Sequence, residues 1–90
     1  KSNQPVLVDF YADWCGPCKM MAPVIEAVAT AIGDKAKVGK INVDDNQATS
    51  QKYEVMSIPT LIIFKDGKAL ERLVGVQDQD SLVKMLEKVI

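Results

Sequence analysis

Residues 5–18 read PVLVDFYADWCGPC, a run of β-branched and aromatic residues that leads into a pair of cysteines. Polar residues are almost absent between Pro5 and Tyr11, which is typical of a strand buried on both faces in the middle of an α/β sheet. A helical pattern starts at Cys15. We therefore expect the cysteines to lie where a central strand turns into a helix.

Cys15 and Cys18 are the only cysteines of the chain, and two residues separate them. A thiol at a helix N-terminus ionises more readily, because unpaired backbone N–H groups and the helix dipole favour the thiolate. The thiolate is the form that attacks another disulfide. The pair is therefore a candidate redox centre.

Two structural roles for the cysteines compete with this hypothesis. A permanent disulfide that closes so short a loop removes little entropy from the unfolded chain. A structural zinc site normally needs four Cys or His ligands, whereas this chain has two cysteines and no histidine. We favour the redox centre, and we expect no metal site.

Helical and strand patterns alternate along the rest of the chain. Apolar residues recur at three- and four-residue steps from Met21 to Ile32, which predicts a helix, and Gly33 is expected to end it. Proline is tolerated in the first turn at Pro17, whereas Pro23 should kink the helix. Strands are predicted over residues 38–43, 60–64 and 68–74, and helices over residues 46–53 and after Asp78, with Asp66-Gly67 as a hairpin turn.

The last two elements complete the predicted topology. The strand over residues 68–74 alternates in polarity, which indicates one buried face. The final helix has an apolar stripe, formed by Leu82, Val83, Leu86, Val89 and Ile90. The order is then β-α-β-α-β-β-α, which predicts an α/β fold with a mixed sheet and helices on both faces.

Length and composition narrow the class of protein. Ninety residues with 48% apolar content suit one small domain, over residues 1–90. The net charge of -1 gives no indication of a nucleic-acid partner or of a membrane surface, and no run approaches the ~20 apolar residues of a membrane span. Two cysteines are too few for a secreted disulfide scaffold, and no apolar signal segment precedes the first strand. We therefore expect a cytoplasmic protein.

Three motifs at matching spacing resemble the thioredoxin family. They are Trp-Cys-Gly-Pro-Cys-Lys at residues 14–19, Ser-Ile-Pro-Thr at residues 57–60 before a strand, and Gly75 after the following strand. The resemblance extends from Val6 to Ile90, and it implies a thioredoxin fold of three layers, α/β/α, around a central mixed sheet. Thioredoxins usually begin with an additional strand and helix, which we expect this chain to lack. Residues 38–43 would then form a sheet edge with exposed backbone groups. We expect a monomer, with this edge as the route to a dimer.

Thiol chemistry and the resemblance assign roles within the redox loop, residues 14–18. Cys15 is expected to be the nucleophile and the more exposed thiol, with a pKa below the free value of about 8.5. Cys18, one turn into the helix and less exposed, is expected to resolve the mixed disulfide by attacking Cys15. Trp14, Gly16 and Pro17 complete the loop.

Asp9 is the one acidic residue in an otherwise apolar strand. Taken alone, such a residue more often points outward from a strand edge, but this strand leads into the redox loop and places Asp9 beneath Cys18. A carboxylate desolvated there has a raised pKa and can take the Cys18 proton, directly or through one water. Thioredoxins carry a buried aspartate at the matching position. Lys40 matches a lysine that could partner it, and an ordinary solvated lysine is an equally good interpretation.

The resemblance also implies a docking surface for clients. It implies a cis peptide bond before Pro59, although only about 5–6% of X–Pro bonds in folded proteins are cis. The backbone of Ile58 would then pair with an extended client segment. An apolar rim would surround the client disulfide, formed by Trp14, Ile58, Val74, Gly75 and Val76.

We interpret Asp44 and Asp45 as a strand end and helix start, and Tyr11 as a neighbour of the site without chemistry of its own.

The function implied by the resemblance is that of a thiol–disulfide oxidoreductase that reduces protein disulfides and binds no cofactor. Electrons would come from thioredoxin reductase, which carries FAD and uses NADPH. Clients would be those of the family: ribonucleotide reductase, peroxiredoxins and methionine sulfoxide reductases. Gly16-Pro17 matches the reducing members, because oxidising relatives typically carry histidine there. Two alternatives stay open: a dedicated extracytoplasmic reductant, and a non-catalytic protein-binding module of the same fold.

Overall fold

The computed structural model describes residues 4–90, and the order of its elements confirms the predicted topology. The elements are β1 Val6–Tyr11, α1 Gly16–Ile32, a 3₁₀ turn Gly33–Lys35, β2 Lys37–Asn42, α2 Gln47–Lys52, β3 Thr60–Lys65, β4 Lys68–Val74 and α3 Gln79–Glu87. Within residues 4–90 the strands form one sheet in the order β2-β1-β3-β4. β1 and β2 are parallel, whereas β3 is antiparallel to both β1 and β4. The sheet is therefore mixed, as predicted.

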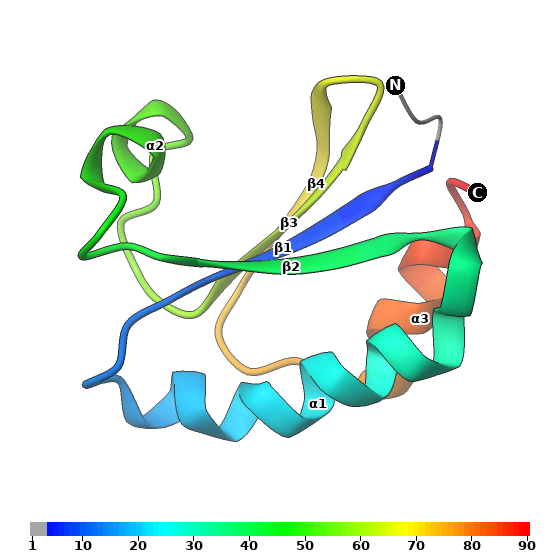
Figure 1. The fold of residues 1–90 in the computed structure, drawn as a ribbon, viewed down its shortest axis with the longest axis horizontal. Helices are drawn as coiled ribbons and strands as arrows, with labels where there is room; N and C mark the ends of the chain where they lie inside the picture. The colour runs from blue at the N-terminus through cyan, green and yellow to red at the C-terminus, as the bar shows by residue number, and fades with distance from the viewer. Residues whose placement is uncertain (1–3) are drawn as a thin grey trace.

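Helices lie on both faces of the sheet (Figure 1). α1 and α3 lie together against one face, and α2 lies on the opposite side, beyond the end of β2. The main core fills the space between α1, α3 and the sheet, and its buried members are Leu7, Met21, Ile25, Val28, Ile32, Ala36, Leu61, Ile63, Leu82 and Leu86. The three layers of an α/β/α fold are thus present.

Local sequence explains where α1 begins and ends. Cys15 is the N-cap, Pro17 lies in the first turn, and the helix continues through Pro23. Gly33 ends the helix with a φ of 59°, a left-handed conformation that glycine adopts without a steric penalty. The cysteines therefore lie at the junction between the carboxyl end of β1 and the start of α1.

Predicted caps and turns position the C-terminal half of the fold. Asp78 is the N-cap of α3, and its side chain accepts a hydrogen bond from the Ser81 N–H at 3.1 Å. Asp66 and Gly67 have φ values of 54° and 79°, as a two-residue type I′ hairpin requires. This hairpin joins β3 to β4 and brings the end of β4 back toward the cysteines.

Two details of exposure differ from the sequence prediction. β4 is exposed along its length, and only Leu73 is partly buried, although the alternation predicted one buried face. The reason is that β4 is an edge strand and is not enclosed between helices. The sequence predicts Ile90 in the apolar stripe of the last helix, but this residue lies beyond the end of α3 and is 52% exposed.

Candidate active site

Cys15 and Cys18 form a disulfide at the N-terminus of α1, with their Cα atoms 5.2 Å apart. The Cys15 Sγ accepts a hydrogen bond from the backbone N–H of Cys18 at 3.2 Å. Cys15 is thus the N-cap of the helix, and its sulfur occupies the position where a capping oxygen normally satisfies a free N–H. A negative charge on this sulfur would be stabilised by that N–H and by the helix dipole.

The two cysteines are equally buried in the disulfide, each with 4% of its surface exposed. The expectation that Cys15 is the more exposed sulfur is therefore wrong for this state. The reason is that Ile58 packs against the cluster of Ala12, Cys15 and Cys18, and the Ile58 carbonyl oxygen lies 3.9 Å from the Cys15 Sγ. The two cysteines differ instead in their surroundings, because Cys18 lines a partly open cavity.

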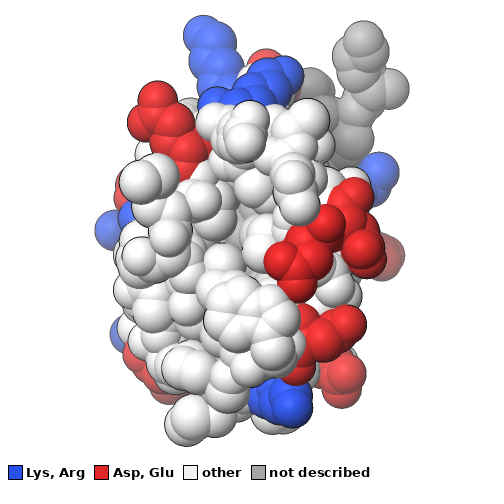
Figure 2. Space-filling view, turned by 90° about the vertical axis from the view of Figure 1, so that its left-hand side faces the viewer, with Lys and Arg blue, Asp and Glu red and all other residues white. Residues whose placement is uncertain are grey.

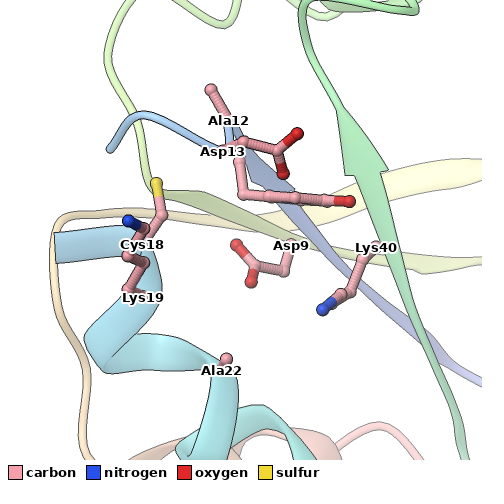
Figure 3. Close-up of a pocket in the computed structure, with 8 residues that line it drawn as sticks. Asp9, Ala12, Asp13, Cys18, Lys19, Ala22 and Lys40 are labelled. Atoms are coloured by element: carbon pink, nitrogen blue, oxygen red, sulfur yellow. The ribbon is translucent and has the colours of Figure 1, made fainter. Parts of the chain in front are cut away.

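This cavity has a volume of about 160 Å³ and contains the Asp9 side chain. Asp9 is 2% exposed, and its Oδ1 makes no hydrogen bond within residues 4–90. Burial raises the pKa of Asp9 to about 6, and the positive charge of Lys40 partly opposes this rise. Figure 3 shows the Asp9 carboxylate between Lys40 and the helix that carries Cys18. The cavity can hold water, and it lies between a sulfur and a carboxylate that titrates close to neutral pH.

Lys40 approaches Asp9 from the neighbouring strand. The two residues are directly paired in the register between β1 and β2. Lys40 is exposed to solvent, yet its Nζ lies 5.0 Å from the centroid of the Tyr11 ring. The interpretation of Tyr11 as a neighbour of the site without chemistry of its own does not include this contact. Its signal in the sequence is the two-residue spacing from Asp9, which puts both side chains on the same face of β1.

The segment before β3 forms one wall of the site. The Ile58–Pro59 peptide bond is cis, and Ile58 packs against the cysteine cluster. The Pro59 carbonyl accepts a hydrogen bond from the Gly75 N–H at 2.8 Å, so the end of β4 is held against this segment. Gly75 has a φ of 93°, a conformation that side chains rarely adopt.

Three of the apolar side chains expected to form the client rim reach solvent. Trp14 is 70% exposed, and Val74 and Val76 are 57% and 49% exposed. The face of the molecule that carries the N-terminal end of α1 is largely uncharged, with acidic residues grouped along one side (Figure 2). The redox loop and the segment around Ile58 thus lie at an apolar surface that a peptide could cover.

One contact of this surface was not foreseen from the sequence. The Trp14 Nε1 donates a hydrogen bond to Asp44 Oδ2 at 2.9 Å. The interpretation of Asp44 as part of a strand end and helix start does not include this bond. No local pattern reveals the contact, because thirty positions separate the two residues. The bond holds the indole at the border between the apolar surface and the end of β2.

No group of three or more His, Cys, Asp or Glu side chains within residues 4–90 is placed to hold a metal ion. In the same part of the chain, no helix is both long enough and apolar enough to cross a membrane.

Comparisons with known proteins agree on one family. The family model described as "Thioredoxin" matches residues 1–88. Thioredoxins of Staphylococcus aureus strains Mu50 and MW2 are each 55% identical over 82 residues, which cover 91% of this chain and 79% of each relative. The solved structure of a mutant thioredoxin from Halobacterium salinarum NRC-1 is 49% identical. It superposes with a TM-score of 0.87 and covers 97% of this chain and 75% of its own.

Proposed function

This chain belongs to the thioredoxin family and is a thiol–disulfide oxidoreductase, and on that premise we propose that it reduces client proteins with Cys15 as nucleophile and Cys18 as resolving thiol. The observation that carries this assignment is the cap of α1. The Cys18 N–H points at the Cys15 Sγ over 3.2 Å. A donor of this kind stabilises negative charge on the first sulfur, which supports Cys15 as the better thiolate.

The proposed cycle starts from the dithiol. The Cys15 thiolate attacks the client disulfide, forms a mixed disulfide, and releases the first client thiolate, which takes a proton from water. Cys18 then loses its proton and attacks the Cys15 sulfur. The Cys15–Cys18 disulfide forms, and the second client thiolate leaves and also takes a proton from water. The client gains two electrons and two protons, and the dithiol is oxidised to the disulfide seen in the structure.

We assign the Cys18 proton to Asp9. Both groups line the same cavity, and the pKa of Asp9 is raised to about 6 by burial. At neutral pH most Asp9 carboxylates are ionised and can accept a proton, and the proton is then released readily to water. Lys40, facing the carboxylate from β2, is the partner that keeps the acceptor ionised.

The client would bind across the apolar surface beside the disulfide. Ile58, with its carbonyl next to the Cys15 Sγ, supports a backbone pairing of the β-addition type with an extended client segment. Side-chain contacts would come from the apolar rim, in which Trp14, Val74 and Val76 are exposed and Ile58 is partly buried. Gly75, which has no side chain, would let the client backbone approach closely.

The electron donor and the clients follow from the family. We propose that a thioredoxin reductase, with its own FAD and NADPH, regenerates the dithiol in the cytoplasm and that the chain itself binds no cofactor. Ribonucleotide reductase, peroxiredoxins and methionine sulfoxide reductases are the proposed clients. The absence of histidine beside Cys15, where Gly16-Pro17 stands, favours the reducing direction.

We further propose that the chain acts as a single-domain monomer. β2 forms one edge of the described sheet and carries Lys37 and Lys40, and charged side chains on an edge strand oppose pairing with a second copy. Light scattering of the purified chain tests this proposal, and a dimer that dissociates when β2 is altered would contradict it.

The decisive test of function is the reduction of insulin disulfides in two arms, one with thioredoxin reductase and NADPH and one with dithiothreitol. Activity in both arms supports the whole proposal. Activity with dithiothreitol alone would contradict thioredoxin reductase as the electron donor but would still support the reduction of disulfides by this chain. Binding of clients without turnover in either arm would indicate a non-catalytic binding module. The double variant Cys15→Ser/Cys18→Ser is the matched control.

A further inference from the structure

The ammonium group of Lys40 rests on an aromatic ring although the side chain is exposed. Its Nζ lies 5.0 Å from the centroid of the Tyr11 ring, within the distance of about 6 Å at which a cation is attracted to the face of an aromatic ring. A lysine side chain is otherwise flexible and strongly hydrated, so an exposed ammonium has little reason to stay in one place. Tyr11 therefore supplies a resting position for the charge.

That position is beside Asp9. Lys40 is paired with Asp9 in the register of β1 and β2, and Tyr11 lies two residues further along β1, on the same face. The three side chains line one cavity. Figure 3 shows the Lys40 Nζ directed toward the Asp9 carboxylate.

We propose that Tyr11 is a positioning residue: its ring holds the Lys40 ammonium at the cavity, where the charge keeps the Asp9 carboxylate in the form that accepts the Cys18 proton. The inference rests on the proposed function for the role of Asp9, whereas the position of the charge can be tested in the oxidised protein without any turnover.

Other groups also line the cavity around Asp9, but Lys40 is the one whose charge acts on the Asp9 pKa. Asp13 and Lys19 line the cavity from the β1–α1 loop and from α1, and Cys18 faces it from the same helix. On the other side of β1, the register places apolar Leu61 of β3 opposite Asp9. Burial and the Lys40 charge are the causes that act on the Asp9 pKa, in opposite directions. Moving the ammonium away would therefore raise this pKa further.

The test is the titration of the Asp9 carboxyl by carbon NMR in the oxidised protein. Tyr11→Phe keeps the ring and should leave the titration midpoint unchanged. Tyr11→Leu removes the ring and should raise the midpoint by several tenths of a pH unit. Lys40→Met should raise it at least as far, and the double variant should match Lys40→Met alone, because Tyr11 acts through Lys40.

The structure offers a matched control. Lys52 Nζ lies 5.4 Å from the Tyr53 ring centroid, a second pairing of lysine and tyrosine that does not involve the cavity lining. Lys52→Met should leave the Asp9 midpoint unchanged. A shift that Tyr11→Leu still produces in the Lys40→Met background would overturn the proposal, because Tyr11 would then act by covering Asp9. An unchanged midpoint in Tyr11→Leu would overturn it as well.

Two further measurements decide the proposal even if a variant does not fold or the protein reduces no client. In the unsubstituted protein, the protons of the Lys40 ε-methylene should show an upfield ring-current shift, and its absence would contradict the proposal even if Tyr11→Leu did not fold. In insulin reduction, the acid limb of the pH–rate profile of Tyr11→Leu should move to higher pH. If the unsubstituted protein reduced nothing, the proposed function would fail, while the NMR titration would still decide the role of Tyr11.

Discussion

The Cys15 Sγ accepts a hydrogen bond from the backbone N–H of Cys18 at 3.2 Å, so the first sulfur caps the helix that carries the second. The contact makes the two cysteines chemically unequal although both are 4% exposed. In the dithiol, the helix end would stabilise the first sulfur as an anion, and the second lies at the Asp9 cavity, where we propose that its proton is removed.

This asymmetry predicts opposite outcomes for the two serine variants. Cys15→Ser should lose insulin reduction entirely, because no thiolate remains at the helix end. Cys18→Ser should also lose turnover, but it should accumulate a stable mixed disulfide with the client, since nothing displaces Cys15. Mass spectrometry of the protein after reaction with an oxidised client peptide distinguishes the two. Trapping by Cys15→Ser instead would reverse the assigned roles.

Asp9→Asn should stabilise the oxidised protein in a pH-dependent way. Asp9 titrates at about 6 in the folded protein, against 3.8 for the unperturbed group, so the folded state binds a proton that the unfolded chain has released between these values. Stability of the unsubstituted protein therefore falls as the pH rises through this window and stays lower above it. The two values differ by an amount that corresponds to about 3 kcal/mol. Urea unfolding near neutral pH should show a gain of up to that size, and the gain should vanish when both states are protonated.

The same variant should slow the resolving step at neutral pH, because Cys18 loses its proton acceptor. Asp13→Asn, which alters an exposed carboxylate of the same cavity, is the matched control and should change neither stability nor rate appreciably. A pH–rate profile of Asp9→Asn identical to that of the unsubstituted protein would exclude Asp9 as the acceptor.

Asp44→Ala should weaken client binding and leave the chemistry intact. The variant removes the acceptor of the Trp14 indole N–H, so the ring is no longer held at the border of the apolar surface. A hydrogen bond of this kind contributes about 1 kcal/mol, which corresponds to roughly a fivefold rise in KM with little change in kcat. Trp14 is the single tryptophan of the chain, so its fluorescence anisotropy should fall in parallel. Asp45→Ala is the control, and an equal effect from both variants would point to surface charge instead.

Asp78→Ala should destabilise the fold without changing the redox chemistry. Asp78 accepts hydrogen bonds from both the backbone N–H and the hydroxyl of Ser81 at the start of α3, and these bonds lower its pKa. The cap is therefore present above the unperturbed pKa and is lost as the pH falls through the lower, folded value. Thermal unfolding should show a decrease for Asp78→Ala that shrinks in acid. Asp80→Ala, in the same turn, should show a smaller decrease.

The sequence predicts the backbone of the site well and its side-chain contacts less well. The buried strand, the capped helix and the spacing of the cysteines are local patterns, and in the structure Asp9 and Cys18 line the same cavity. The Trp14–Asp44 bond joins residues far apart in the sequence, and no local pattern encodes it. The spacing of Tyr11 from Asp9 indicates only a shared face of β1, whereas the contact with Lys40 also depends on strand register and on rotamers.

The exposure of individual side chains was predicted least well, because it also depends on how distant elements pack. The burial of Cys15 comes from Ile58, a residue that reaches the redox loop only after β3 pairs with β1. Polar and apolar residues do alternate along β4, but this periodicity cannot distinguish a strand covered by helices from a strand at the edge of the sheet.

The equal covering of both sulfurs has a consequence for how the protein behaves among abundant small thiols. With 4% of each cysteine exposed, a small thiol has few directions from which to reach the disulfide, whereas a protein that binds beside Ile58 is held next to it. We therefore expect a bound protein partner to exchange electrons with the disulfide faster than a small thiol at equal concentration.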